Sequence, residues 1–134
     1  MLKYVIAYVA TAVVFFGLDF VWLSRALGFY RGEIGSLLLE TPKFGYAAGF
    51  YLLYVVGIVA LVVVPATTAG GWVQALLMGA LLGLVAYGTY DMTNMATLKG
   101  YTLRVALVDM GWGMFVTAVA AVIGTLVTQW LAPA

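Results

Sequence analysis

Four long apolar segments constrain the fold of this chain more than any other feature of its sequence. They run from about Tyr4 to Leu23, Phe44 to Val64, Trp72 to Thr97 and Leu103 to Trp130. A helix of about 20 residues rises roughly 30 Å, which matches the hydrocarbon core of a bilayer. Because lipid accepts only helices or closed barrels, and these segments do not alternate as strands do, we predict an all-α fold. The expected architecture is a single domain over residues 1–134, an integral membrane four-helix transmembrane bundle.

The composition supports an integral membrane protein and argues against several classes of function. The chain is 66% hydrophobic and 8% charged, with a mean hydropathy of +1.12, whereas about a quarter of the residues of a soluble domain are charged. Six Lys and Arg residues are too few for a nucleic-acid-binding surface. Neither cysteine nor histidine occurs, so the common ligands of zinc, copper and haem and the usual general base are missing. We expect no metal site and no cofactor, and the sequence leans against an enzyme.

The basic residues predict how the chain is oriented in the membrane. Only Lys3 lies on one side, and the first and third connections hold Arg25, Arg31, Lys43, Lys99 and Arg104. By the positive-inside rule, both connections face the cytoplasm and both termini are extracytoplasmic. The first connection, residues 24–43, has room for a short interfacial helix that ends at Thr41-Pro42. The first apolar segment lacks a small-residue cleavage site, so we interpret it as a retained helix.

Three aspartates, Asp19, Asp91 and Asp109, lie inside or at the edge of the apolar segments. A charged carboxylate at the centre of a bilayer-spanning helix costs roughly 2.5–3.5 kcal/mol on insertion scales. Each aspartate therefore needs a partner, a proton or a ligand. With the predicted topology, all three fall within about two helical turns of the cytoplasmic boundary. We expect the three carboxyl groups to converge.

Polar and small residues lie on the same helix faces as these aspartates. Tyr87, for example, precedes Asp91 by four residues and therefore lies on the same face. Such stripes usually face other helices. The pattern Asp-x-x-Trp occurs twice, on helices that run in opposite directions, so it is no simple tandem repeat. The candidate substrate- or ion-binding residues are Asp19, Trp22, Tyr87, Tyr90, Asp91, Thr93, Asn94, Asp109 and Trp112. Candidate contacts for a lipid headgroup are Arg25, Arg31 and Arg104.

Three blocks of the sequence resemble one family of small bacterial membrane proteins. The first two are Tyr90-Asp91-Met92-Thr93-Asn94-Met95-Ala96-Thr97-Leu98 and Val108-Asp109-Met110-Gly111-Trp112-Gly113. The third is Leu18-Asp19-Phe20-Val21-Trp22-Leu23, with Phe29-Tyr30-Arg31 and Gly35 after it. The family is known as domain of unknown function twenty-one seventy-seven, and the resemblance covers essentially the whole chain. It implies a four-helix integral membrane protein, which we expect in the bacterial inner membrane, and it implies no reaction.

Three classes of function remain open on the sequence alone. In the first, the aspartates bind or transport a cationic or amphiphilic small molecule, or a lipid, with proton coupling, because carboxylates among aromatic rings suit an organic cation. In the second, the chain is a non-catalytic membrane subunit or an assembly factor. In the third, it is a lipid-modifying membrane enzyme that uses Asp91 or Asp109 as acid–base and arginines to hold a headgroup phosphate.

The aspartates also fit a purely structural role, in which they tie helix ends together through Asn94, Thr93 or the arginines of the connections. The expected partners are membrane lipid and a small-molecule cation, with no nucleic acid. Small residues four apart, as in Gly45–Gly49 and Gly79–Gly83, fit packing within the monomer or a homodimer face.

Overall fold

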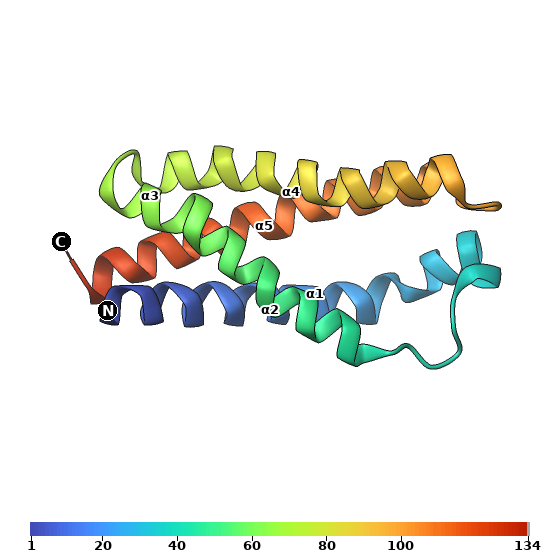
Figure 1. Cartoon of the computed structure of the whole chain (residues 1–134), viewed down its shortest axis with the longest axis horizontal. Helices are drawn as coiled ribbons and strands as arrows, with labels where there is room; N and C mark the ends of the chain where they lie inside the picture. Colours follow the sequence, from blue (N-terminus) through green and yellow to red (C-terminus); the bar gives the residue numbers. More distant parts are fainter. Residues whose placement is uncertain (134) are drawn as a thin grey trace.

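The computed structural model describes residues 1–133, which form helices joined by short connections (Figure 1). The elements are α1 (Leu2–Ile34), a 3₁₀ turn η1 (Gly35–Leu37), α2 (Phe44–Ile58), a π-helical turn η2 (Val59–Val63), α3 (Val64–Thr68), α4 (Gly71–Thr97) and α5 (Leu103–Leu131). Four stretches are long and apolar enough to cross a membrane: Leu2–Leu37, Phe44–Thr68, Gly71–Thr97 and Leu103–Leu131. The prediction of an all-α fold with four spanning helices is confirmed. The start of α1 and the end of α5 lie at the same end of the bundle (Figure 1).

Helices α4 and α5 form an antiparallel hairpin that packs along most of its length. Glycines allow the close approach. A Cβ atom on Gly83 would collide with the backbone of Gly113, and one on Gly79 would lie 2.9 Å from the Cα atom of Ala118. Small residues at helix contacts are the usual means of association within lipid, where no water is available to drive burial. Helix α1 packs against the α5 side of this hairpin.

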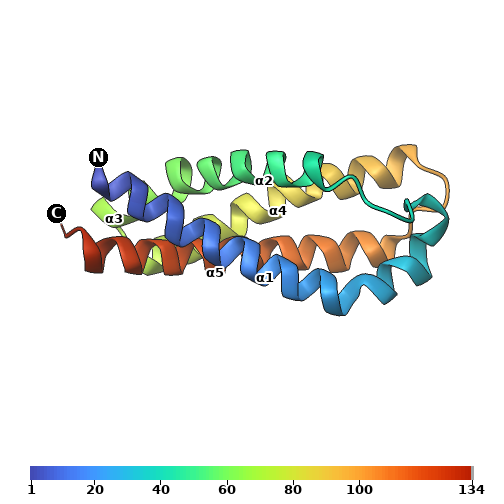
Figure 2. The ribbon, with the colours of Figure 1, turned by 90° about the horizontal axis from the view of Figure 1, so that it is seen from below.

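Helix α1 lies against α5 and runs in the opposite direction (Figure 2). It continues to Ile34, well beyond the end near Leu23 that its hydropathy predicts. Its 33 residues correspond to about 50 Å of helix, which is longer than the hydrocarbon core. No proline interrupts it, and its last turns gain a packing surface on the α4–α5 turn, where Ile34 is 6% exposed. The first connection is therefore mostly helical and shorter than expected.

The second spanning segment continues past Val64 through a local change of helix type. Pro65 has no N–H to donate, and its ring would clash with the carbonyl four residues before it. The π-helical turn η2, immediately before α3, widens the helix at that point. The chain then turns at Gly70 and Gly71, whose φ angles of 93° and 61° favour glycine.

Helix α2 crosses the bundle at an angle and contacts it through its second half (Figures 1 and 2). Residues 41–50 are all exposed, and the first half-buried side chain of α2 is Tyr51. From there on, Val55, Ile58 and Val63 join the central core, which Phe15 of α1 enters as its largest fully buried side chain. The Phe15 ring packs edge-to-face with the rings of Tyr51 and Tyr54, with centroid distances of 5.5 and 5.4 Å.

Candidate functional site

Asp91 is fully buried near the end of α4 and is bound by a side chain from the following turn. The Tyr101 hydroxyl donates a hydrogen bond of 2.6 Å to its Oδ1 atom, while its Oδ2 atom is buried without a hydrogen-bond partner. Burial and the hydrogen bond to Asp91 raise the pKa of Tyr101, so this phenol stays protonated and remains a donor at neutral pH. The pair joins α4 to the start of α5.

Asp109 is partly exposed and accepts a hydrogen bond from the far end of α1. The Tyr30 hydroxyl donates to its Oδ1 atom over 2.8 Å. The same hydroxyl accepts a hydrogen bond of 3.1 Å from the indole Nε1 of Trp22, two turns earlier on α1. Tyr30 therefore links an indole and a carboxyl group, and it is placed by the part of α1 that extends beyond the expected helix end.

Asp19 is 6% exposed and accepts a hydrogen bond of 3.2 Å from the indole Nε1 of Trp112 on α5. The rings of Trp22 and Trp112 are stacked, with centroids 4.6 Å apart and planes within 5° of parallel. The two Asp-x-x-Trp patterns therefore face each other across the α1–α5 contact. Trp112 reaches the aspartate of the first pattern directly, and Trp22 reaches that of the second through the Tyr30 hydroxyl. Because the two helices are antiparallel, the tryptophan of each pattern lies near the aspartate of the other.

The three carboxyl groups form one aspartate cluster, which we define as Asp19, Asp91 and Asp109. The Asp109 carboxyl is close enough to interact electrostatically with those of Asp19 and Asp91. The hydrogen bonds that these groups accept come from neutral tyrosine and tryptophan donors. The candidate headgroup residues Arg25, Arg31 and Arg104 are exposed at the surface. In the part of the chain that the structure describes, no three acidic side chains are arranged so that they could coordinate a metal ion together.

The remaining candidate residues lie on α4 around this cluster. Tyr87 is half-buried, and its ring lies against Gly113 and 6.2 Å from that of Tyr54. Asn94 is half-buried beside the hydroxyls of Tyr90 and Tyr101. Tyr90 is 59% exposed, and Thr93 is exposed on the outer face of the helix. The structure thus brings Asn94 to the cluster and leaves Thr93 outside it.

Two residues that bind the aspartates were not among the sequence candidates: Tyr30 and Tyr101. Tyr30 belongs to the Phe29-Tyr30-Arg31 block that carried the family resemblance, but it followed the expected end of the first helix. Tyr101 lies in a turn between two segments that each hold an aspartate. That position is a signal that sequence reasoning could have used, because the turn brings the hydroxyl to the ends of both helices.

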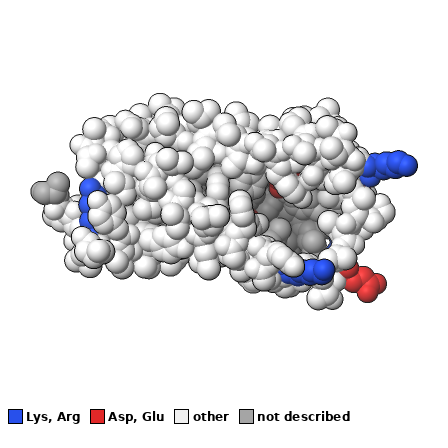
Figure 3. Space-filling view, in the orientation of Figure 1, with Lys and Arg blue, Asp and Glu red and all other residues white. Residues whose placement is uncertain are grey.

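A hollow opens on the face of the molecule shown in Figure 3, between α1 and the α4–α5 hairpin and beside the first turns of α2. An acidic side chain is visible at its wall, and a basic side chain lies at its lower rim. The Tyr51 hydroxyl on α2 lies within electrostatic range of Asp19, Asp109 and Tyr90. Tyr51 on α2 and Tyr90 on α4 therefore lie close to the aspartate cluster, on two different helices.

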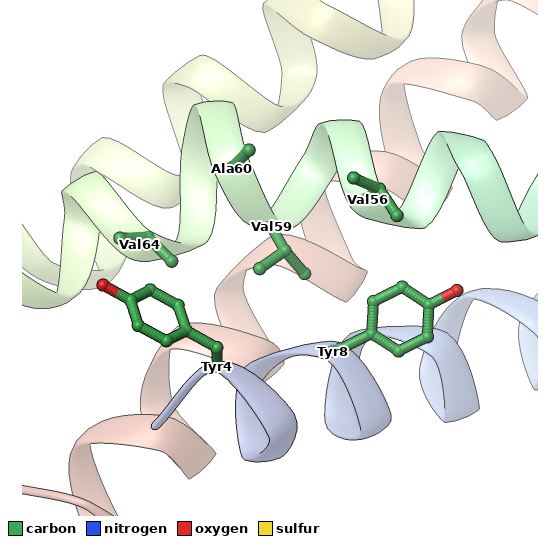
Figure 4. A pocket seen from close by; sticks show the side chains of 6 residues that line it. All are labelled: Tyr4, Tyr8, Val56, Val59, Ala60 and Val64. Atoms are coloured by element: carbon green, nitrogen blue, oxygen red, sulfur yellow. The ribbon is translucent and has the colours of Figure 1, made fainter. Parts of the chain in front are cut away.

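A second hollow lies nearer the start of α1, and its lining residues are uncharged. It is a cavity of about 370 Å³ lined by Tyr4, Tyr8, Val56, Val59, Ala60 and Val64 (Figure 4). The Tyr8 hydroxyl donates to the backbone oxygen of Leu52 over 3.0 Å. This cavity has mostly apolar walls and no charged side chain among its lining residues, so the hollow of Figure 3 is the better candidate site for a charged ligand.

Comparison with known proteins gives a family and no further relative. The family described as "Predicted membrane protein (DUF2177)" matches residues 4–126, which include the aspartate cluster and its aromatic donors. No curated protein and no solved structure shows a significant match to the chain. The assignment of a function therefore depends on the geometry of the site.

Proposed function

The chain belongs to the family of predicted membrane proteins DUF2177, and we propose that this member binds a small organic cation at the aspartate cluster and exchanges it for a proton. The observation that carries the proposal is the Oδ2 atom of Asp91. It is buried and receives no hydrogen bond from an N–H or O–H donor, and the Asp91 carboxyl group lies within hydrogen-bonding reach of that of Asp109. Two buried carboxylates beside a third that is partly exposed need compensation by a proton or a cation, since an uncompensated charge in a low-dielectric site is costly.

The aromatic surroundings favour an organic cation over a metal ion. Tyrosine and tryptophan rings attract a cation through their faces, and they do not supply the several oxygen ligands that magnesium or calcium requires. The Trp112 indole and two tyrosine hydroxyls bond to the cluster, and the Trp22 indole stacks on that of Trp112. Because the cation and the proton would use the same carboxyl oxygens, each lowers the affinity for the other, and this coupling is reciprocal.

Binding of tetraphenylphosphonium to the protein in phosphatidylcholine nanodiscs tests the proposal. We expect saturable binding that weakens as the pH is lowered. Substitutions Asp91→Asn and Asp109→Asn should each lower the affinity about tenfold, as the loss of a contact of about 1.5 kcal/mol does. Glu40→Gln is the matched control, because Glu40 is exposed in the connection before α2. If the parent protein shows no pH-dependent binding and both substitutions only lower its stability, the proposal is wrong and a partner-subunit role is favoured.

A further inference from the structure

The end of the bundle away from the termini is closed over the aspartate cluster. The last turns of α1 cross the α4–α5 turn, where Ile34 and Tyr101 are 6% and 8% exposed and pack together. Thr102 caps α5 by accepting a hydrogen bond from the backbone N–H of Val105, and its hydroxyl donates to Oε1 of Glu33 on α1 over 2.9 Å. The same closure carries Tyr30 and Tyr101, which bind two of the aspartates. A ligand that approaches along the bundle axis from this end meets packed side chains.

In contrast to this closed end, the side of the bundle next to the first turns of α2 is open. The first turns of α2 stand away from the other helices, with Phe44 66% and Phe50 61% exposed. The hollow of Figure 3 lies beside these turns, with an acidic side chain at its wall and a basic side chain at its rim. Lys and Arg residues on a spanning protein usually mark the level of the lipid headgroups. The hollow therefore opens toward the headgroup and upper acyl-chain region of one leaflet.

We infer that the ligand is an amphiphile with a cationic head and an apolar tail, which enters sideways from this leaflet between Tyr51 and Tyr90. The inference rests on the proposed function and adds the substrate class and the route. The positively charged head binds at the aspartate cluster, whose carboxylates complement its charge. The tail remains between the exposed aromatic side chains of α2 and the surrounding lipid, where it costs no exposure of apolar surface to water.

A reversible crosslink across the proposed entrance tests the route. The chain contains no cysteine, so Tyr51→Cys with Tyr90→Cys gives a unique pair for a bis-methanethiosulfonate reagent. The probe is radiolabelled hexadecyltrimethylammonium, counted on phosphatidylcholine nanodiscs in excess of protein-free nanodiscs. We expect crosslinking to slow its association at least tenfold and reduction to restore the rate. Each single-cysteine variant treated with the same reagent is the control, and an unchanged rate after crosslinking would overturn the lateral route.

A comparison of ligands on the unmodified protein tests the substrate class and needs no variant to fold. At equal aqueous concentration, hexadecyltrimethylammonium should bind more than tenfold tighter than tetramethylammonium, since each methylene removed from water contributes about fourfold in affinity. Hexadecanol, with the same tail and no charge, should not bind above the lipid background. Equal affinity for the two ammonium ions overturns the amphiphile while the cation site survives. Absence of binding by both ammonium ions and by tetraphenylphosphonium overturns the proposed function itself.

Discussion

Replacing Tyr101 with phenylalanine removes the hydroxyl that binds the most buried carboxyl group of the protein. Tyr101 Oη lies 2.6 Å from Asp91 Oδ1, and Asp91 has no exposed surface. A hydrogen bond to a charged group contributes about 1.5–3 kcal/mol and one between neutral groups about 0.5–1.5 kcal/mol. The free energy of unfolding should therefore fall by about 0.5–3 kcal/mol, and the size of the loss reports whether Asp91 is charged.

The assay is reversible unfolding of the protein in mixed micelles as the fraction of dodecyl sulfate is raised, followed by circular dichroism. A double-mutant cycle with Asp91→Asn isolates the contribution of the Asp91 charge, because the amide oxygen of asparagine still accepts a hydrogen bond from Tyr101. If Asp91 is charged, Tyr101→Phe should cost less in the Asp91→Asn protein than in the parent. Tyr46→Phe is the control, since Tyr46 is 79% exposed and should change stability by no more than about 0.5 kcal/mol.

The pH dependence of the same variant has a definite sign. Burial and the bond to Asp91 raise the pKa of Tyr101 in the folded protein above its value of about 10 in an unfolded chain. Its contribution is present in full below about pH 10 and is lost as the pH rises from there toward the folded-state pKa. The parent should lose stability in alkali more steeply than Tyr101→Phe does. Equal costs for Tyr101→Phe and Tyr46→Phe, with parallel alkaline slopes, would refute the reasoning.

Three further predictions follow from the packing and the topology. Gly83→Ala should lower the free energy of unfolding by about 1–3 kcal/mol, because its methyl group would collide with the α5 backbone. Gly111→Ala is the control, since the space around Gly111 is open and the stability should not fall. Unfolding by dodecyl sulfate compares the two variants. Trp112→Phe should abolish the near-ultraviolet circular dichroism of the stacked indole pair, and an unchanged spectrum would show that the rings are not stacked. Single cysteines at Ala69 and Ala132 should react with an impermeant maleimide only from the extracytoplasmic side, and labelling from the cytoplasm would reverse the predicted orientation.

The sequence determined the fold class and the helix faces of this protein for direct physical reasons. Segment length and hydropathy identify spanning helices, because an unpaired backbone polar group in lipid is too costly for other structures. Helical periodicity then places Asp91 on the same helix face as Tyr87. It likewise places Asp109 on the same face of its own helix as Trp112. The boundaries of the helices were less certain. Helix α1 passes its expected end because its last turns bury Ile34 against another part of the chain, which no local pattern records.

Only the tertiary structure decided which residues meet across those faces. The two Asp-x-x-Trp patterns were visible in the sequence, but their exchange of hydrogen bonds depends on the antiparallel contact of α1 with α5 and on the register of that contact. Tyr30 and Tyr101 reach Asp109 and Asp91 because the extension of α1 and the α4–α5 turn fold over the same end of the bundle. Periodicity fixes the direction of a side chain relative to its own helix, whereas the group opposite it is set by packing between segments far apart in the chain.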